Sequence, residues 1–207
     1  MLPAISTIPF ANDMPSNPEQ AAAGFDPVER GRSIVVRVRP LTRERFAPFG
    51  EVIEAGHPEQ RRIVNDGTAE RFHDLANIDP GPQGRAIVSI FRSRPRELPL
   101  PLVSMERHPL ASQAFVPLSG RRWLVVVAPA GGPPVAEGLV AFLASGEQGV
   151  NYAPGVWHHP LIALDAPSDF LVVDRSGPGE NCDETILDRP ARVETVDDGG
   201  PRHGDDR

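Results

Sequence analysis

Lysine is absent from this chain of 207 residues, because all 21 basic residues are arginine. This absence excludes catalysis through a Schiff base on a lysine side chain. Cysteine is nearly absent as well, and the single Cys182 has no second cysteine with which to form an internal disulfide. The sequence therefore gives no sign of an oxidising compartment.

The chain also lacks an excess of positive charge and a long apolar run. Its formal net charge is −7 and its pI is near 5.4, so nucleic acid is not an expected partner. A small anionic substrate stays compatible with this charge, because local arginines can outweigh the net charge. No stretch approaches the roughly 18 apolar residues of a membrane span. The first 20 residues contain no Lys or Arg and are interrupted by prolines, unlike a secretory signal. We expect a cytoplasmic protein that contacts no membrane.

The composition predicts one folded domain with an extension at each end. The hydrophobic fraction of 40% is typical of a globular protein. Residues 1–33 are rich in Pro and Ala without a clear period, which predicts a mobile extension. Residues 191–207 are acidic and contain several glycines, which predicts a disordered tail. The folded unit is therefore expected at residues 34–190.

Strand patterns dominate this unit. Residues 33–38 alternate apolar and polar side chains, and short β-branched or apolar runs follow between Gly and Pro residues. These runs are residues 52–54, 86–91, 113–117, 123–128, 139–143 and 170–174. One short helix is predicted at Thr42–Phe49, with Thr42 as N-cap and Gly50 as the C-cap position. The pattern predicts an all-β fold with a few short helices, an antiparallel sandwich or barrel.

Two segments carry residue types that suit a chemical site. The first runs from Glu106 through His108 to Gln113, and the second is the segment 149–160, with a Pro-Gly turn before His158. Together they resemble the two motifs of the cupin family, with Glu106 at the first histidine position and Gln113 at the carboxylate position. Residues two apart on a strand face the same way, so Glu106 and His108 can point into one barrel, and the turn can bring His158 there.

This set predicts either a metal site or a polar cavity without metal. A carboxylate and two imidazoles suit a divalent ion such as Ni, Mn, Zn or Fe, so Glu106, His108, Gln113 and His158 are the candidate ligands. Gln113 is a neutral, weak ligand, which favours the alternative in which the same residues bind the substrate directly.

Longer strings resemble the ureidoglycolate lyase family. They are ERFHDL (70–75), ERHPLASQAFVPL (106–118), EQGVNY (147–152), VWHHPL (156–161) and DRSGPGENCD (174–183), in order over residues 34–187. The resemblance implies a homodimeric cupin-type antiparallel β-barrel, or jelly roll, of allantoin breakdown. It implies cleavage of (S)-ureidoglycolate to glyoxylate and urea, and a requirement for nickel or a stimulation by it.

The chemistry of such a cleavage assigns roles to individual residues. A base must take the hydroxyl proton while the C–N bond breaks, and an acid must protonate the departing nitrogen. An arginine suits the substrate carboxylate because its guanidinium binds in bidentate fashion. The catalytic candidates are Glu106, His108, His158 and His73. The substrate-binding candidates are Arg71, Arg92, Asn65, Tyr152 and His159.

Three further interpretations complete the sequence-based expectations. Asp174 and Arg175 are interpreted mainly as a structural ion pair. Hydrolysis of the ureido group with release of ammonia is one alternative activity, although it normally needs a richer metal site than six histidines suggest. A non-catalytic cupin that binds a small carboxylate is the other alternative. The nitrogen product released from ureidoglycolate would separate these readings.

Overall fold

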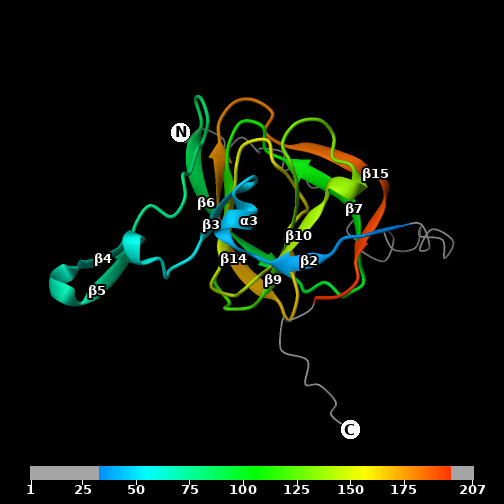
Figure 1. Ribbon diagram of the computed structural model, residues 1–207. Helices are drawn as coiled ribbons and strands as arrows, with labels where there is room; N and C mark the ends of the chain where they lie inside the picture. Colours follow the sequence, from blue (N-terminus) through cyan, green and yellow to red (C-terminus); the bar gives the residue numbers. More distant parts are fainter. Residues whose placement is uncertain (1–32, 197–207) are drawn as a thin grey trace, which may run out of the picture. The chain divides into compact units, whose positions relative to one another are not determined.

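The computed structural model describes residues 33–196 (Figure 1). Almost all of its regular elements are strands, which confirms the all-β class. The predicted extension at 1–33 lies outside the described residues apart from Ser33, and so do residues 197–207 of the predicted tail. The last strand continues past the predicted boundary at 190 to Val193. None of the helices within residues 33–196 is long and apolar enough to cross a membrane.

The strands form two large sheets. The first sheet has the order β1-β15-β7-β12-β9-β10-β2, with β13 paired to β9, and the second has the order β3-β11-β8-β14-β6. The strands of the first sheet are β1 (Ile34–Val35), β2 (Val38–Pro40), β7 (Leu100–Arg107), β9 (Trp123–Ala128), β10 (Val140–Ala144), β12 (Trp157–His158), β13 (Ile162–Ala163) and β15 (Asp183–Val193). Those of the second are β3 (Gly50–Ile53), β6 (Arg85–Ser93), β8 (Gln113–Pro117), β11 (Gly149–Tyr152) and β14 (Ser168–Ser176). Most of the pairs are antiparallel, and the sheets curl into a half-barrel of the cupin-like kind (Figure 1).

Strand β9 is buried on both of its faces, and so its sequence is one apolar run instead of an alternating one. Trp123, Val125 and Val127 pack with residues of the second sheet, such as Phe115 and Val172. The intervening residues of β9 pack in a second core with the apolar residues of β7 and β15. The two cores fix β9 in the interior, and its neighbour β12 carries His158.

The predicted helix forms a single turn, α3 (Arg43–Phe46). Thr42 caps it as expected, because its hydroxyl accepts a hydrogen bond from the Arg45 amide at 3.4 Å. The helix ends earlier than predicted, since Gly50 already belongs to β3 and is not a C-cap. Gly50 has φ of 141°, and a Cβ there would collide with the carbonyl oxygen of Asn151 on the paired strand β11. A glycine is therefore needed for strand pairing and not for helix termination.

Two further differences concern strands. The predicted strand at 33–38 is interrupted after Val35, because β1 pairs with β15 while β2 pairs with β10. A hairpin of β4 (Arg61–Val64) and β5 (Ala69–Phe72) was not predicted, and its strands pair only with each other. We call residues 58–73 the arm, since Figure 1 shows this hairpin projecting from the two sheets.

Candidate active site

The centre of the site consists of Glu106, His108 and His158. Glu106 lies near the end of β7, His108 follows that strand directly, and β12 places His158 opposite Glu106 in the register. One ligand atom from each of the three side chains lies within 4.8 Å of the others. Glu106 Oε1 is 3.4 Å from His158 Nε2, and the two imidazole centroids are 5.3 Å apart. The structure thus confirms the predicted convergence of these three residues.

The turn before β12 secures this arrangement. Gly155 has φ of 76°, a conformation that favours glycine, and its amide donates a hydrogen bond of 2.8 Å to the carbonyl oxygen of His108. The Pro-Gly turn therefore does what its position in the sequence predicted, because it ties the two motifs together through the backbone.

Backbone carbonyls set the tautomers of the two histidines. His108 Nδ1 lies 2.6 Å from the carbonyl oxygen of Asn181, and His158 Nδ1 lies 3.1 Å from that of Val156. A carbonyl oxygen can only accept, so each Nδ1 carries the hydrogen. Each Nε2 then faces the centre of the site, where both Nε2 atoms are buried without a hydrogen-bond partner among residues 33–196. Unpartnered buried nitrogens are costly, and they indicate a place for a ligand.

Gln113 and Tyr152 form one wall of the site. They pair across β8 and β11, and both are buried. The Tyr152 ring stacks on the His158 imidazole with a centroid distance of 4.2 Å and an angle of 9°. Gln113 lies close enough to His108 to affect its pKa, and Gln113 Oε1 is a further buried atom without a partner in the described chain. The structure thus brings Gln113 and Tyr152 beside the histidines, while their roles as ligand and substrate-binding residue stay predictions.

The surroundings set the charges of the site. Burial, followed by the charge of His158, lowers the pKa of the His108 imidazole. For Glu106, burial acts to raise the pKa, but contact with His158 and the charges of neighbouring histidines outweigh it and lower the pKa. Burial raises the pKa of Tyr152, so its hydroxyl keeps its proton. At neutral pH the site therefore combines an ionised carboxylate with a neutral His108.

His159 lies beside the central cluster and faces another side. Its Nδ1 is 2.7 Å from the carbonyl oxygen of Pro160, and burial lowers its pKa to about 4. The charge of Glu106 affects this pKa, which places His159 near the site. We therefore expect His159 to stay neutral beside the cluster.

Four of the predicted site residues are not brought to this cluster. Asn65, Arg71 and His73 belong to the arm, where all three are exposed. Arg92 is on β6 and binds both carboxylate oxygens of Asp169, at 2.7 and 2.8 Å, with 76% of its side chain exposed. The expectation that these four line a common site with the histidines is therefore not met within the described chain. The arm residues separate from the cluster because the Asn65-Asp66-Gly67 turn closes the hairpin on itself, with φ of 53° at Asn65 and Asp66.

Two segments beside the site, residues 80–82 and 178–181, are held in place by Arg175 and Asn181, and we call these segments the rim. Neither residue was predicted to do so. The Arg175 guanidinium donates hydrogen bonds to the carbonyl oxygens of Pro80, Pro82 and Pro178 at 3.4, 3.2 and 2.6 Å. It thereby joins the segment before β6 to the segment before β15. The Asn181 side chain accepts a hydrogen bond from the Leu110 amide at 2.9 Å, while its carbonyl orients His108. These contacts are made through the backbone, which sequence spacing does not reveal.

Asp174 and Arg175 do not form the predicted ion pair. They are adjacent on β14 and so face opposite sides of the sheet. No ion pair joins them in the described chain, and Asp174 Oδ1 is buried without a hydrogen-bond partner there. Burial raises the pKa of this carboxyl.

Glu106, His108 and His158 fit a divalent metal. An imidazole Nε2 on each histidine is unpartnered, and the ionised Glu106 supplies charge. A second group of possible ligands shares Glu106 with Cys182 and Glu184. Burial and nearby carboxylates raise the pKa of the Cys182 thiol to about 11, which makes it a poor ligand at neutral pH.

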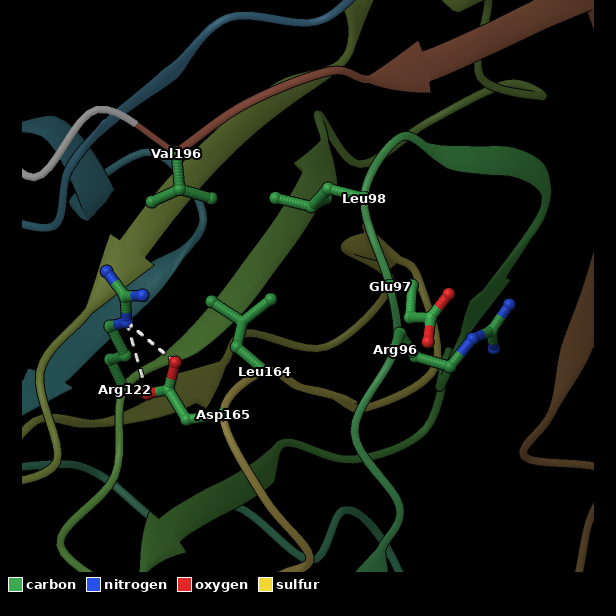
Figure 2. Close-up of a pocket in the computed structure, with 7 residues that line it drawn as sticks. All are labelled: Arg96, Glu97, Leu98, Arg122, Leu164, Asp165 and Val196. Carbon is green, nitrogen blue, oxygen red and sulfur yellow. Dashed lines mark hydrogen bonds and ion pairs between the residues drawn. The ribbon is translucent and has the colours of Figure 1, made fainter.

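A pocket of about 410 Å³ lies elsewhere in the fold (Figure 2). It is lined by Arg96, Glu97, Leu98, Arg122, Leu164, Asp165 and Val196. Arg122 Nε binds both carboxylate oxygens of Asp165, at 3.0 and 3.1 Å, as the dashed lines in Figure 2 show. This pocket has no histidine in its lining, so it lacks the pair of imidazoles that distinguishes the cluster described above.

Comparison with known proteins agrees with the geometry. A family model described as ureidoglycolate lyase matches residues 33–194. A ureidoglycolate lyase of Burkholderia cepacia is 56% identical over 156 residues, which is 74% of this chain and 87% of the relative. Ureidoglycolate lyases of Brucella anthropi and of Pseudomonas fluorescens strain SBW25 are 52% and 48% identical. These matches cover 77% and 75% of this chain, and 94% and 93% of the relatives.

Proposed function

Because this chain belongs to the ureidoglycolate lyase family, we propose that it cleaves the C–N bond of (S)-ureidoglycolate and releases glyoxylate and urea. One observation supports the proposal above all others. Two buried Nε2 atoms that have no hydrogen-bond partner within residues 33–196 face an ionised carboxylate, and one ligand atom from each of the three residues lies within 4.8 Å of the others. A base and an acid are thereby available on either side of a small substrate.

The tautomers suggest which residue does what. His108 is neutral and presents a lone pair at Nε2, so it accepts the proton of the substrate hydroxyl while the carbonyl of glyoxylate forms. His158 Nε2 lies 3.4 Å from the Glu106 carboxylate on the other side of the site, and we assign His158 the role of the acid that delivers a proton to the departing urea nitrogen. The elimination thus moves one proton from oxygen to His108 and another from His158 to nitrogen.

We propose, as an alternative route, that the site takes a divalent metal, with Ni²⁺ as the suspected ion and the two Nε2 atoms acting as ligands instead of as base and acid. Glu106, His108 and His158 would hold it, and Gln113 would contribute a neutral oxygen. When bound, the metal would polarise the hydroxyl and carboxylate of the substrate. In the route without metal, the same residues act on the substrate directly. Chelation should remove the activity if the metal is needed and leave it unchanged if it is not.

Product identification tests this function. Purified protein should release urea from (S)-ureidoglycolate in equal amount to glyoxylate, before and after chelation if no metal is needed. Release of ammonia without added urease would favour the ureido hydrolysis instead. No product at all, with retained binding of glyoxylate, would indicate a cupin that only binds a small carboxylate.

We also propose a cytoplasmic homodimer that acts in allantoin degradation. The outer face of the second sheet exposes Val88, Ile90 and Leu118, and β6 is an edge strand that pairs with β14 alone. Exposed apolar patches of this kind are typical of contact surfaces between subunits. Ile90→Asp should convert a dimer to a monomer in light scattering after size exclusion. A monomeric wild-type protein would contradict the proposal.

A further inference from the structure

The side chain of Asp174 lies on the inner face of β14. Phe170 and Val172 of this strand are buried in the core between the two sheets, and the strand pairs with β6 without a register shift. Alternation along the strand therefore puts Asp174 on the same inner face.

The register to the next strand brings Asp174 beside the active site. Val173 pairs with Ala114 of β8, so one further step in this antiparallel pair sets Asp174 opposite Gln113. Gln113 in turn pairs with Tyr152, whose ring stacks on His158. Asp174, Gln113 and Tyr152 thus form a row across three neighbouring strands, and this row leads to His158.

In this row, one side-chain oxygen of Asp174 and the side-chain oxygen of Gln113 receive no hydrogen bond. Asp174 Oδ1 and Gln113 Oε1 are both buried, and neither has a partner anywhere in residues 33–196. Arg175, the neighbouring cation, faces the other side and binds backbone carbonyls. Two adjacent buried acceptors without donors cost free energy in the empty protein, which points to a ligand that brings N–H groups.

We infer that Asp174 is a specificity-determining residue that binds the N–H groups of the ureido moiety, with Gln113 accepting a further N–H beside it. The inference rests on the proposed function, because it assigns one half of ureidoglycolate to this row. The ureido half carries three N–H bonds and the glyoxylate half carries none. The N–H bonds of the two urea nitrogens that point away from the carbonyl run parallel, so they match the two oxygens of a carboxylate.

The same contact orients the reacting carbon. With the ureido group held between Asp174 and Gln113, the hydroxyl-bearing carbon and its carboxylate lie toward His108 and His158. Asp174 is absent from the three-residue group whose ligand atoms lie within 4.8 Å of one another. This separation suits a residue that binds the leaving group and not the metal or the reacting oxygen.

Asp174→Asn is the sharpest test, because it keeps the shape and places an NH₂ group or a weaker acceptor against the substrate N–H bonds. We expect KM for ureidoglycolate to rise by about tenfold to about a hundredfold, the range for losing a charged acceptor. Competitive inhibition by urea should weaken by a similar factor, while inhibition by glyoxylate should stay within about twofold. A melting temperature equal to or above that of wild type would show that the fold is intact.

The matched control is Asp169→Asn on the same strand, which removes an exposed carboxylate paired with Arg92 and should leave KM unchanged. Two results overturn the inference. One is a KM and a urea inhibition constant for Asp174→Asn equal to those of the control. The other is an equal weakening of urea and glyoxylate inhibition, which would show a general distortion of the site. A wild-type protein that releases no urea would instead refute the proposed function itself, so the two failures are distinguishable.

Discussion

Arg175→Met would show whether one side chain holds the rim of the site together. Arg175 is half-buried and joins the segment at 80–82 to Pro178 through three backbone carbonyls. Methionine keeps the aliphatic packing and removes every one of these donors. We expect the variant to lose both stability and catalytic efficiency.

The lengths of the three hydrogen bonds set the size of the effect. A hydrogen bond from a charged donor contributes about 1.5 to 3 kcal/mol when it is well formed. The bonds to Pro80 and Pro82 are long, at 3.4 and 3.2 Å, and Pro82 and Pro178 are exposed, so solvent screens much of the gain. We therefore expect a loss of about 2 kcal/mol in the free energy of unfolding. For a domain of this size, the melting temperature should fall by about 4 to 8 °C.

Catalysis should suffer because the joined segments support Asn181. The carbonyl of Asn181 orients His108, and a rotated imidazole no longer presents its Nε2 to the substrate. We expect kcat/KM to fall by about tenfold. Gly84→Ala should act in the same direction, since a Cβ at Gly84 would collide with Arg175 Nη1 and with the carbonyl oxygen of Pro80.

Arg92→Met is the matched control for differential scanning calorimetry and for the activity assay. It removes a bidentate ion pair with Asp169 that is largely exposed, and such pairs contribute about 0 to 1 kcal/mol. Its melting temperature should change by no more than about 4 °C. Arg175→Met melting at the temperature of Arg92→Met would refute the idea that Arg175 holds the rim.

The remaining predictions concern protons and metal. Because burial raises the pKa of Asp174, the ionised carboxyl destabilises the folded state above that pKa, and the penalty disappears below the usual value of 3.8. Asp174→Asn should therefore melt above wild type at neutral pH and equal to it at about pH 3; a lower melting temperature at neutral pH would speak against this. Because the pKa of His108 is lowered from 6.5, the acid limb of kcat/KM should lie below pH 6.5; an acid limb centred above 6.5 would argue against His108 as the base. His108→Ala and His158→Ala should lose bound metal and activity together, as measured by elemental analysis and turnover, and full activity of demetallated wild type would contradict this.

Spacing in the sequence was enough to predict the centre of the site. Glu106 and His108 converge on one cluster because they are two residues apart at the end of a strand, and the Pro-Gly turn places His158 beside them. These relations are local or depend on one tight turn, so they need no knowledge of the register between distant strands. The strand at 123–128 was likewise predicted, since an apolar run of this length fits a strand buried on both faces.

The arm shows where local patterns fail. Its strands hold charged residues at most exposed positions and bury little apolar surface, so nothing in the segment resembled a core strand. The pairing of β4 with β5 depends on the left-handed conformation of Asn65 and Asp66, which the Asn-Asp-Gly sequence permits but does not require. Arg71 and His73 were therefore assigned to the site from their residue types and the ERFHDL string, neither of which reveals the hairpin that holds them in the arm.

For Asp174, the sequence predicts which face of the strand the side chain lies on, but not which residue of the neighbouring strand it lies beside. Alternation along 168–176 already separates the inner residues Phe170, Val172 and Asp174 from the outer Arg175, so the pattern argued against an ion pair between neighbours. What the pattern lacks is the partner strand. Only the pairing of Val173 with Ala114 reveals that the inner carboxylate stands next to Gln113. A buried acid in an apolar strand is costly, and proteins keep such costs mainly where function requires them. The pairing turns that general expectation into a specific one, because it identifies the ureido half of the substrate as the group that compensates the cost.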